Sequence, residues 1–133
     1  MQLLSPAHWS DYELLDCGND QKLERFGRVI TIRPEPQALW RPAYSEKDWE
    51  KKAHVRFVQK GSSSGTWNAL RGDLPSSWKV QYPLPKGPQL SFRLALTGFK
   101  HVGVFPEQAV NWDYIYRNMS GISGARFLNL FAY

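Results

Sequence analysis

The stretch LTGFKHVGVFPEQAVNWDY, residues 96–114, marks the point where the sequence changes from a strand pattern to a helical pattern. Pro106 suits the first position of a helix, and Glu107 suits the first turn, where the helix dipole favours a negative charge. Apolar residues then recur at near-helical spacing, at Ala109, Trp112 and Tyr116. The pattern predicts the longest helix of the chain, from Pro106 to about residue 118.

The residues before this stretch indicate a small, mainly antiparallel β structure. Short segments of strand length are separated by clusters of Gly, Pro, Ser, Asn and Asp, as is typical of hairpins and turns. We expect strands at residues 12–18, 28–34, 54–59, 66–70, 78–82 and 90–97. The segment QKLERFG is interpreted as the connection between the first two strands, and residues 36–42 as a turn or a short helical stub.

A second, shorter helix is predicted from Glu46 to about Lys52. Ser45 is a suitable N-cap, and acidic residues follow it in the first turn. The rest of the chain contains no internal repeat. The expected fold of residues 10–98 is therefore a β structure with one or two short helices.

The last nine residues, ARFLNLFAY, form an almost unbroken apolar run after the loop SGISG. We predict a strand from about Arg126 to Tyr133. A strand that is apolar on both faces is typical of the inside of a parallel sheet, and a helix followed by such a strand is how an α/β domain begins.

Composition limits the function classes. The chain has 133 residues, enough for one core, and its 17 Lys and Arg against 12 Asp and Glu give a net charge of +5. That excess suits a polyanionic partner, although a solvated surface explains it more simply. With a single cysteine, no visible signal sequence and no apolar run near the roughly 18 residues of a membrane span, we expect a cytoplasmic protein without a membrane partner.

Candidate catalytic and metal-binding groups are sparse. The three histidines, His8, His54 and His101, are far apart in sequence and lack the spacing of a zinc cluster, so no metal is expected. Cys17 lies in a predicted strand without a neighbouring histidine and is interpreted as a small buried residue. The carboxylates are interpreted as helix caps or as residues on solvent-exposed faces, and no catalytic residue can be assigned from the pattern.

Tryptophans leave two interpretations open. They can stack on bases of a nucleic acid, or they can pack in the core, which is the more common role in a chain of this size. The residues concerned are Trp40, Trp49, Trp67 and Trp78.

The densest grouping of polar residues lies in residues 96–114. Lys100, His101, Gln108 and Asn111 alternate with apolar residues at the entrance to the predicted helix. The free N–H groups of a helix N-terminus can receive a carboxylate or a phosphate. A binding site and a purely structural turn before a helix explain this pattern equally well.

The segment LTGFKHVGVFPEQAVNWDYI, together with ARFLNLFAY, resembles the bacterial class I S-adenosylmethionine-dependent methyltransferases that are related to the large-subunit ribosomal RNA cytosine-C5 methyltransferases. The segment LLDCGNDQKLERFGRVITIRPEPQALW is similar to the N-terminal part of one branch of that family. The resemblance runs from about Tyr12 to Tyr133. It implies an α+β chain with a β-rich N-terminal domain at 1–104, followed at 105–133 by the opening helix and first strand of a truncated Rossmann-like methyltransferase domain.

The resemblance also implies roles for individual residues. The F-x-x-Q-x-x-N pattern matches the helix that closes over S-adenosylmethionine in that family, where the glutamine amide can bond the methionine part of the cofactor. It therefore implies cofactor binding by Phe105, Gln108, Asn111 and Phe131, and RNA binding by Lys100 and His101. Ala109 departs from the family, whose archetype has arginine there, and the glycine-rich cofactor turn would follow Tyr133.

The resulting hypothesis is the N-terminal fragment of a methyltransferase that acts on RNA, with ribosomal RNA as the expected partner. S-adenosylmethionine is the cofactor of the full-length parent, and the fragment alone is expected to be inactive and not to bind it. The C-terminal strand, with its unpaired edge, could also mediate self-association. The alternatives are a stand-alone nucleic-acid-binding module without catalytic activity, based on the positive charge and the aromatic residues, and a purely structural or interaction domain.

Overall fold

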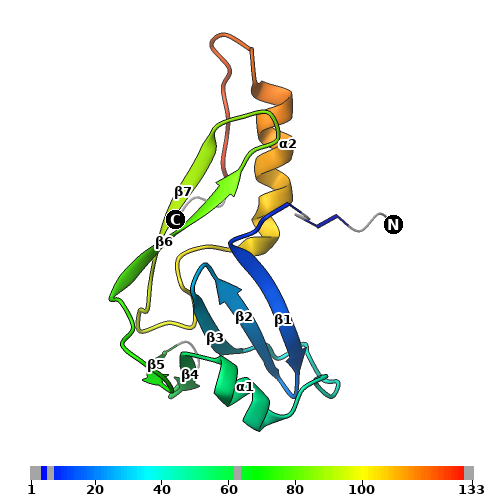
Figure 1. Cartoon of the computed structure of the whole chain (residues 1–133). Helices are drawn as coiled ribbons and strands as arrows, with labels where there is room; N and C mark the ends of the chain where they lie inside the picture. The colour runs from blue at the N-terminus through cyan, green and yellow to red at the C-terminus, as the bar shows by residue number, and fades with distance from the viewer. Residues whose placement is uncertain (1–3, 6–7, 62–63, 131–133) are drawn as a thin grey trace.

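The computed structural model describes residues 4–5, 8–61 and 64–130, and it shows an α+β fold (Figure 1). A five-stranded sheet has the order β1-β2-β3-β4-β5, and β6 and β7 form a separate two-stranded hairpin. Every strand pair is antiparallel except β3 with β4, so the predicted mainly antiparallel architecture is confirmed. The elements are β1 (Tyr12–Gly18), β2 (Gln21–Phe26), β3 (Val29–Pro34), α1 (Glu46–Lys52), β4 (Val55–Gln59), β5 (Gly65–Ala69), β6 (Ser77–Pro83), β7 (Gln89–Ala95), the short 3-10 helix η1 (Pro106–Gln108) and α2 (Ala109–Met119).

Strand β2 is the main correction to the expected elements. It was predicted as a connection, but it pairs with β1 on one side and β3 on the other. Asn19 and Asp20 form the turn between β1 and β2 with φ of 51° and 59°, and Gly27 opens the next turn with φ of 58°. Positive φ at both central residues is the mark of a tight two-residue hairpin turn, so two consecutive hairpins replace the single connection.

Helix α1 covers one face of the five-stranded sheet and has the predicted bounds. The Ser45 side chain accepts a hydrogen bond from the Asp48 N–H and caps the helix. Trp49 is buried in a hydrophobic cluster with Leu23, Ile32 and Ala53. This small second core fixes the crossover that makes β3 and β4 parallel.

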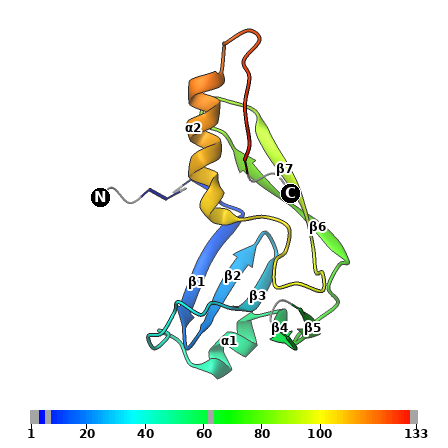
Figure 2. The same ribbon diagram turned by 180° about the vertical axis from the view of Figure 1, so that it is seen from behind.

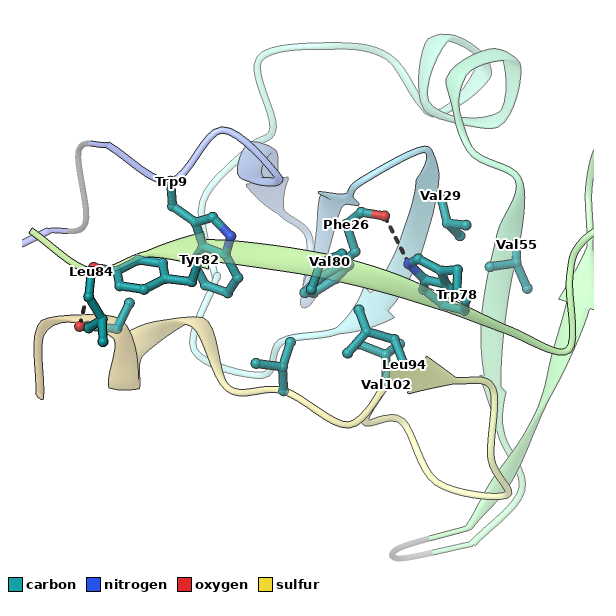
Figure 3. Close-up of a cluster of buried hydrophobic side chains, with 12 residues drawn as sticks. Trp9, Phe26, Val29, Val55, Trp78, Val80, Tyr82, Leu84, Leu94 and Val102 are labelled. Atoms are coloured by element: carbon teal, nitrogen blue, oxygen red, sulfur yellow. Dashed lines mark hydrogen bonds between the residues drawn. The ribbon is translucent and has the colours of Figure 1, made fainter. Parts of the chain in front are cut away.

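The opposite face of the sheet packs on the β6–β7 hairpin (Figure 3). The Trp78 indole N–H donates to the Phe26 carbonyl at 3.0 Å and so ties the hairpin to the end of β2. Helix α2 lies along the hairpin in both views (Figures 1 and 2), and Ala109 belongs to the same buried cluster as Leu94. The predicted domain boundary at 104/105 thus falls within one shared core, and the boundary itself stays a prediction.

Residues 36–42 form no helical stub. Their backbone is committed to the β1–β2 turn, because the Asn19 N–H donates to the Trp40 carbonyl at 2.8 Å and the Asp20 N–H to the Ala38 carbonyl at 2.9 Å. Gly18 makes this approach possible, since a Cβ there would lie 2.4 Å from the Pro42 nitrogen.

The predicted C-terminal strand is wrong over residues 126–130, which are irregular, and residues 131–133 lie outside the described part of the chain. A strand needs neighbours to bond its backbone groups, and no described strand pairs with this segment. Phe127, Leu128 and Leu130 are exposed. The Rossmann-like assignment of residues 105–133 and self-association through them remain predictions.

Candidate functional site

Three of the predicted site residues meet at one cavity of about 170 Å³, here called the Lys100 cavity. Lys100, His101 and Phe105 come from the segment that leads from β7 to η1. The His101 ring packs tilted against the Phe105 ring, with 5.0 Å between centroids. The wall is completed by residues of β2, β3 and η1, by Glu35 after β3 and by Val104 before η1, namely Lys22, Arg33, Pro34, Glu35, Val104, Pro106 and Glu107.

The surroundings of His101 favour its neutral form. Burial is the largest influence, and the positive charges of Arg33 and Lys100 act in the same direction, so the pKa of His101 lies below its ordinary value. A neutral imidazole contributes a hydrogen bond and a stacking face but no charge. Charge recognition in this cavity therefore depends on the lysines, since Arg33 is buried and paired with Glu24.

A buried ionic network lies at the base of the cavity. Glu24 is 0% exposed and Arg33 is 4% exposed. The Arg33 guanidinium donates to the Glu24 carboxylate from Nε at 2.8 Å and from a terminal nitrogen at 2.6 Å, and it also donates to the Lys100 carbonyl at 3.0 Å. This last bond ties the segment that carries the predicted site residues to strand β3.

Tyr12 completes the network. Its hydroxyl donates to the second carboxylate oxygen of Glu24 at 3.0 Å. Burial, followed by the negative charge of Glu24, raises the pKa of Tyr12 far above its ordinary value. The phenol is therefore a fixed hydrogen-bond donor and does not act as a base at physiological pH.

A second cavity, of about 320 Å³, adjoins the first and is here called the Trp40 cavity. Lys22 and Glu35 line both cavities, and their side chains form an ion pair at 3.1 Å. Burial would raise the pKa of Glu35, but the hydrogen bond and charge of Lys22 outweigh it and lower the pKa. The remaining lining comes from β1 and from the loop between β3 and α1, namely Tyr12, Leu14, Cys17, Gln37, Ala38 and Trp40.

Asp16 anchors the loop that carries Trp40. Its carboxylate accepts backbone N–H bonds from Ala43 at 3.1 Å and Tyr44 at 2.9 Å, and the Trp49 indole N–H at 2.9 Å. Burial alone would raise the pKa of Asp16, but these bonds, with a further one from Cys17, hold it below its ordinary value. One carboxylate thus connects β1, the loop and α1.

Replacing Asp16 by alanine is expected to lower the free energy of unfolding by about 2 kcal/mol at neutral pH, because several donors lose a charged acceptor. In the wild type this contribution is complete above the pKa of aspartate in the unfolded chain. It declines as the pH falls through the lowered pKa of the folded state. Urea unfolding between pH 7 and pH 3 measures both effects.

The matched control is Asp20→Asn, since Asp20 is an exposed residue in the β1–β2 turn. Its stability profile with pH should follow the wild type. An Asp16→Ala variant with wild-type stability and wild-type acid sensitivity would contradict this role for Asp16.

Gln108 and Asn111 lie apart from both cavities. They are exposed at the start of α2, where the Asn111 amide donates to the Gln108 side-chain oxygen at 2.9 Å. The predicted Phe131 lies outside the described residues. Gln108 and Asn111 thus lie on an exposed surface, while Phe105 lines the Lys100 cavity, and the binding of S-adenosylmethionine by these residues stays a prediction.

A third cavity, of about 390 Å³, is lined by Arg28, Val29, His54, Asp73, Leu74 and Pro75 and contains none of the predicted site residues. His54 has a structural role here, because its Nδ1 accepts the Ile30 N–H at 3.0 Å. Within residues 4–5, 8–61 and 64–130, no group of three or more His, Cys, Asp or Glu side chains could hold a metal ion. The helices among these residues are too short or too polar to cross a bilayer.

The tryptophans divide between the two interpretations. Trp49 and Trp78 are buried, and Trp67 packs partly buried against Phe57, so core packing is confirmed for these three. Trp40 is 57% exposed. Sequence reasoning missed Lys22, Glu24, Arg33 and Glu35 at the site, and the available signal was Asn19-Asp20, whose turn chemistry predicts the β1–β2 hairpin that brings them together.

Comparison with family models finds no match, and comparison with curated proteins also finds none. Among solved structures, the chain is similar to one described as the SAM dependent methyltransferase from Agrobacterium tumefaciens, with a TM-score of 0.77 and 33% sequence identity. The match covers 92% of this chain but only 37% of that protein. This similarity supports a relationship to S-adenosylmethionine-dependent methyltransferases in general.

Proposed function

We propose that this chain is the N-terminal part of an S-adenosylmethionine-dependent methyltransferase that acts on RNA, with ribosomal RNA as the substrate. The observation that carries the proposal is the 33% identity to a methyltransferase over 92% of the chain. The resemblance of residues 96–115 to the ribosomal RNA cytosine-C5 branch supports the RNA target. A cytoplasmic location belongs to the same proposal.

The direct test uses the natural protein at its full length, incubated with radiolabelled S-adenosylmethionine and large-subunit ribosomal RNA. Label in the RNA, located at cytosine C5 by nuclease digestion and mass spectrometry, is the expected result. Label in a protein or a small molecule would contradict the RNA target. Failure to bind S-adenosylmethionine at full length would contradict the methyltransferase assignment itself.

The 133-residue chain alone is expected to be inactive. Gln108 and Asn111 lie on an exposed surface at the start of α2, whereas small-molecule sites bury most of their ligand. Isothermal titration of the chain with S-adenosylmethionine should therefore give no binding heat. Micromolar affinity for this chain would show that the 133 residues contain a complete cofactor site and would overturn the expectation.

A second candidate function is a stand-alone nucleic-acid-binding module. The observation in its favour is the net charge of +5 together with the exposed Trp40 beside basic residues. Under this hypothesis the chain binds RNA in a salt-dependent manner, and the natural full-length protein transfers no methyl group. The methyl-transfer assay above separates the two candidates.

A further inference from the structure

We propose that the Trp40 cavity is a stacking site for an unpaired base of single-stranded RNA, and that the adjoining Lys100 cavity receives the neighbouring phosphate. The inference rests on the proposed RNA-directed function, which it extends by naming the recognition surface. It concerns the β structure alone and requires neither bound cofactor nor methyl transfer.

Trp40 has the exposure and rigidity of a stacking residue. Its side chain is 57% exposed, yet its indole N–H donates to the Cys17 carbonyl at 2.9 Å, which fixes the ring at the end of β1. The backbone of the loop is held by bonds from Asn19 and Asp20 and by the Asp16 carboxylate. A ring that is already ordered loses little conformational entropy when a base stacks on it.

The lining of the Trp40 cavity matches the chemistry of a nucleobase. Leu14 is exposed, and together with the indole it offers apolar surface for the faces of a flat ring. Gln37 and the Lys22–Glu35 pair supply donors and acceptors for the polar edge of the base. Apolar walls with a few polar groups are typical of small aromatic ligands.

The Lys100 cavity adjoins the Trp40 cavity and contributes a further cation, Lys100. Lys22 and Glu35 line both cavities, so the two are contiguous. Lys22 pairs with Glu24 at 3.6 Å and with Glu35 at 3.1 Å. Lys100 lies close enough for its charge to act on Glu35, but no described carboxylate is within ion-pair distance of it. Lys100 is therefore the side chain available to a phosphate next to the stacked base.

These features favour RNA over an acidic peptide as the occupant. The cations and carboxylates that line the two cavities nearly balance, so charge alone would attract an acidic peptide weakly. An exposed, oriented indole instead stacks on any base, because every base has a π-face. Stacking should therefore carry most of the affinity at this surface, and Lys100 a smaller part.

The test measures fluorescence anisotropy of a short fluorescein-labelled single-stranded RNA of mixed sequence, titrated with this chain at low and moderate salt. Trp40→Ala should weaken binding by roughly 5- to 150-fold, the range expected for loss of one base–aromatic stack. Trp40→Phe keeps a stacking face but loses the bond to Cys17, and should retain most of the affinity. Lys100→Ala should reduce the slope of log affinity against log salt by about 0.7.

Tyr114→Ala is the matched control, since Tyr114 is an exposed aromatic residue on α2 that lines neither cavity. It should bind as the wild type does. Circular dichroism and thermal unfolding of each variant identify any loss that comes from misfolding, and Trp40→Phe keeps the proposal testable if Trp40→Ala unfolds.

RNA binding that is equal in the wild type and Trp40→Ala would overturn the stacking site and leave the proposed RNA-directed function standing. Absence of RNA binding by the natural full-length protein as well as by this chain would contradict both. A dimer in sedimentation that Trp40→Ala dissociates would show that Trp40 is covered by a second copy of the chain, and would also overturn the proposal.

Discussion

Replacing Glu24 by alanine is expected to lower the free energy of unfolding by about 3–5 kcal/mol. The substitution leaves the Arg33 guanidinium, which is 4% exposed, without its counter-charge, and leaves the Tyr12 hydroxyl without its acceptor. An unpaired buried charge costs far more than a lost surface ion pair, because neither water nor another group replaces the partner. Urea unfolding followed by tryptophan fluorescence measures the loss.

The double variant Glu24→Leu/Arg33→Met is the control. It removes both charges and keeps apolar volume, so it should recover most of the lost stability. A residual loss of about 1–2 kcal/mol is expected, because the Lys100 carbonyl loses the bond from Arg33 and the Tyr12 hydroxyl loses its acceptor. If Glu24→Ala unfolds within 1 kcal/mol of the wild type, or the double variant is as unstable as the single one, the network is not the buried ion pair described above.

Replacing Tyr82 by alanine is expected to cost about 3–5 kcal/mol as well, for a different reason. The ring is fully buried and joins three segments that are distant in sequence. It packs edge-on against Trp9 at 5.2 Å and Trp112 at 5.3 Å, and tilted against His8 at 5.2 Å. Truncation would open a cavity where the N-terminal segment, β6 and α2 meet (Figure 3).

Tyr82→Phe separates the ring from the hydroxyl. The hydroxyl donates to the Ala109 carbonyl at 3.4 Å, a long bond whose loss should cost no more than about 1 kcal/mol. Urea unfolding should therefore rank the wild type and Tyr82→Phe close together and Tyr82→Ala well below both. Equal losses in the two variants would mean that the hydroxyl, and not the packing of the ring, carries the stability.

The elements that were predicted well are those whose signals are local. Ser45 with the acidic first turn located α1 at its observed bounds, and Pro106 with the apolar spacing of Ala109 and Trp112 located η1 and α2. The alternation of apolar and polar residues predicted the two strands of the β6–β7 hairpin. Each of these signals acts within one or two turns of chain and does not depend on the remaining residues.

The wrong secondary-structure predictions concern segments whose structure depends on the strands beside them. Residues 21–26 carry charges that suggest a connection, and they form a central strand because two tight turns place β1 and β3 on either side. Residues 126–130 carry the apolar pattern of a strand, and they remain irregular, with no described strand paired to them. Strand propensity is realised only when neighbouring backbones accept the hydrogen bonds.

At the candidate site, the sequence indicated Lys100, His101 and Phe105, and the structure does bring these three together. It could not indicate that Gln108 and Asn111 would bond each other outside the cavities. Nor could it indicate that Arg33 would reach from β3 to the Lys100 carbonyl, 67 positions along the chain. Contacts at such separation depend on how the sheet and the hairpin pack.

The sequence by itself therefore determined the positive charge, the helix positions and most strands, because composition, caps and periodicity are properties of neighbouring residues. The resemblance to a methyltransferase rests separately on the motifs of residues 14–40, 96–115 and 125–133. Only the tertiary structure decided which tryptophan stays exposed, that Glu24 and Arg33 are buried together, and that Lys22 and Glu35 join two cavities. The physical reason is burial. Whether a side chain is desolvated depends on the elements that cover it, and those elements come from distant parts of the chain.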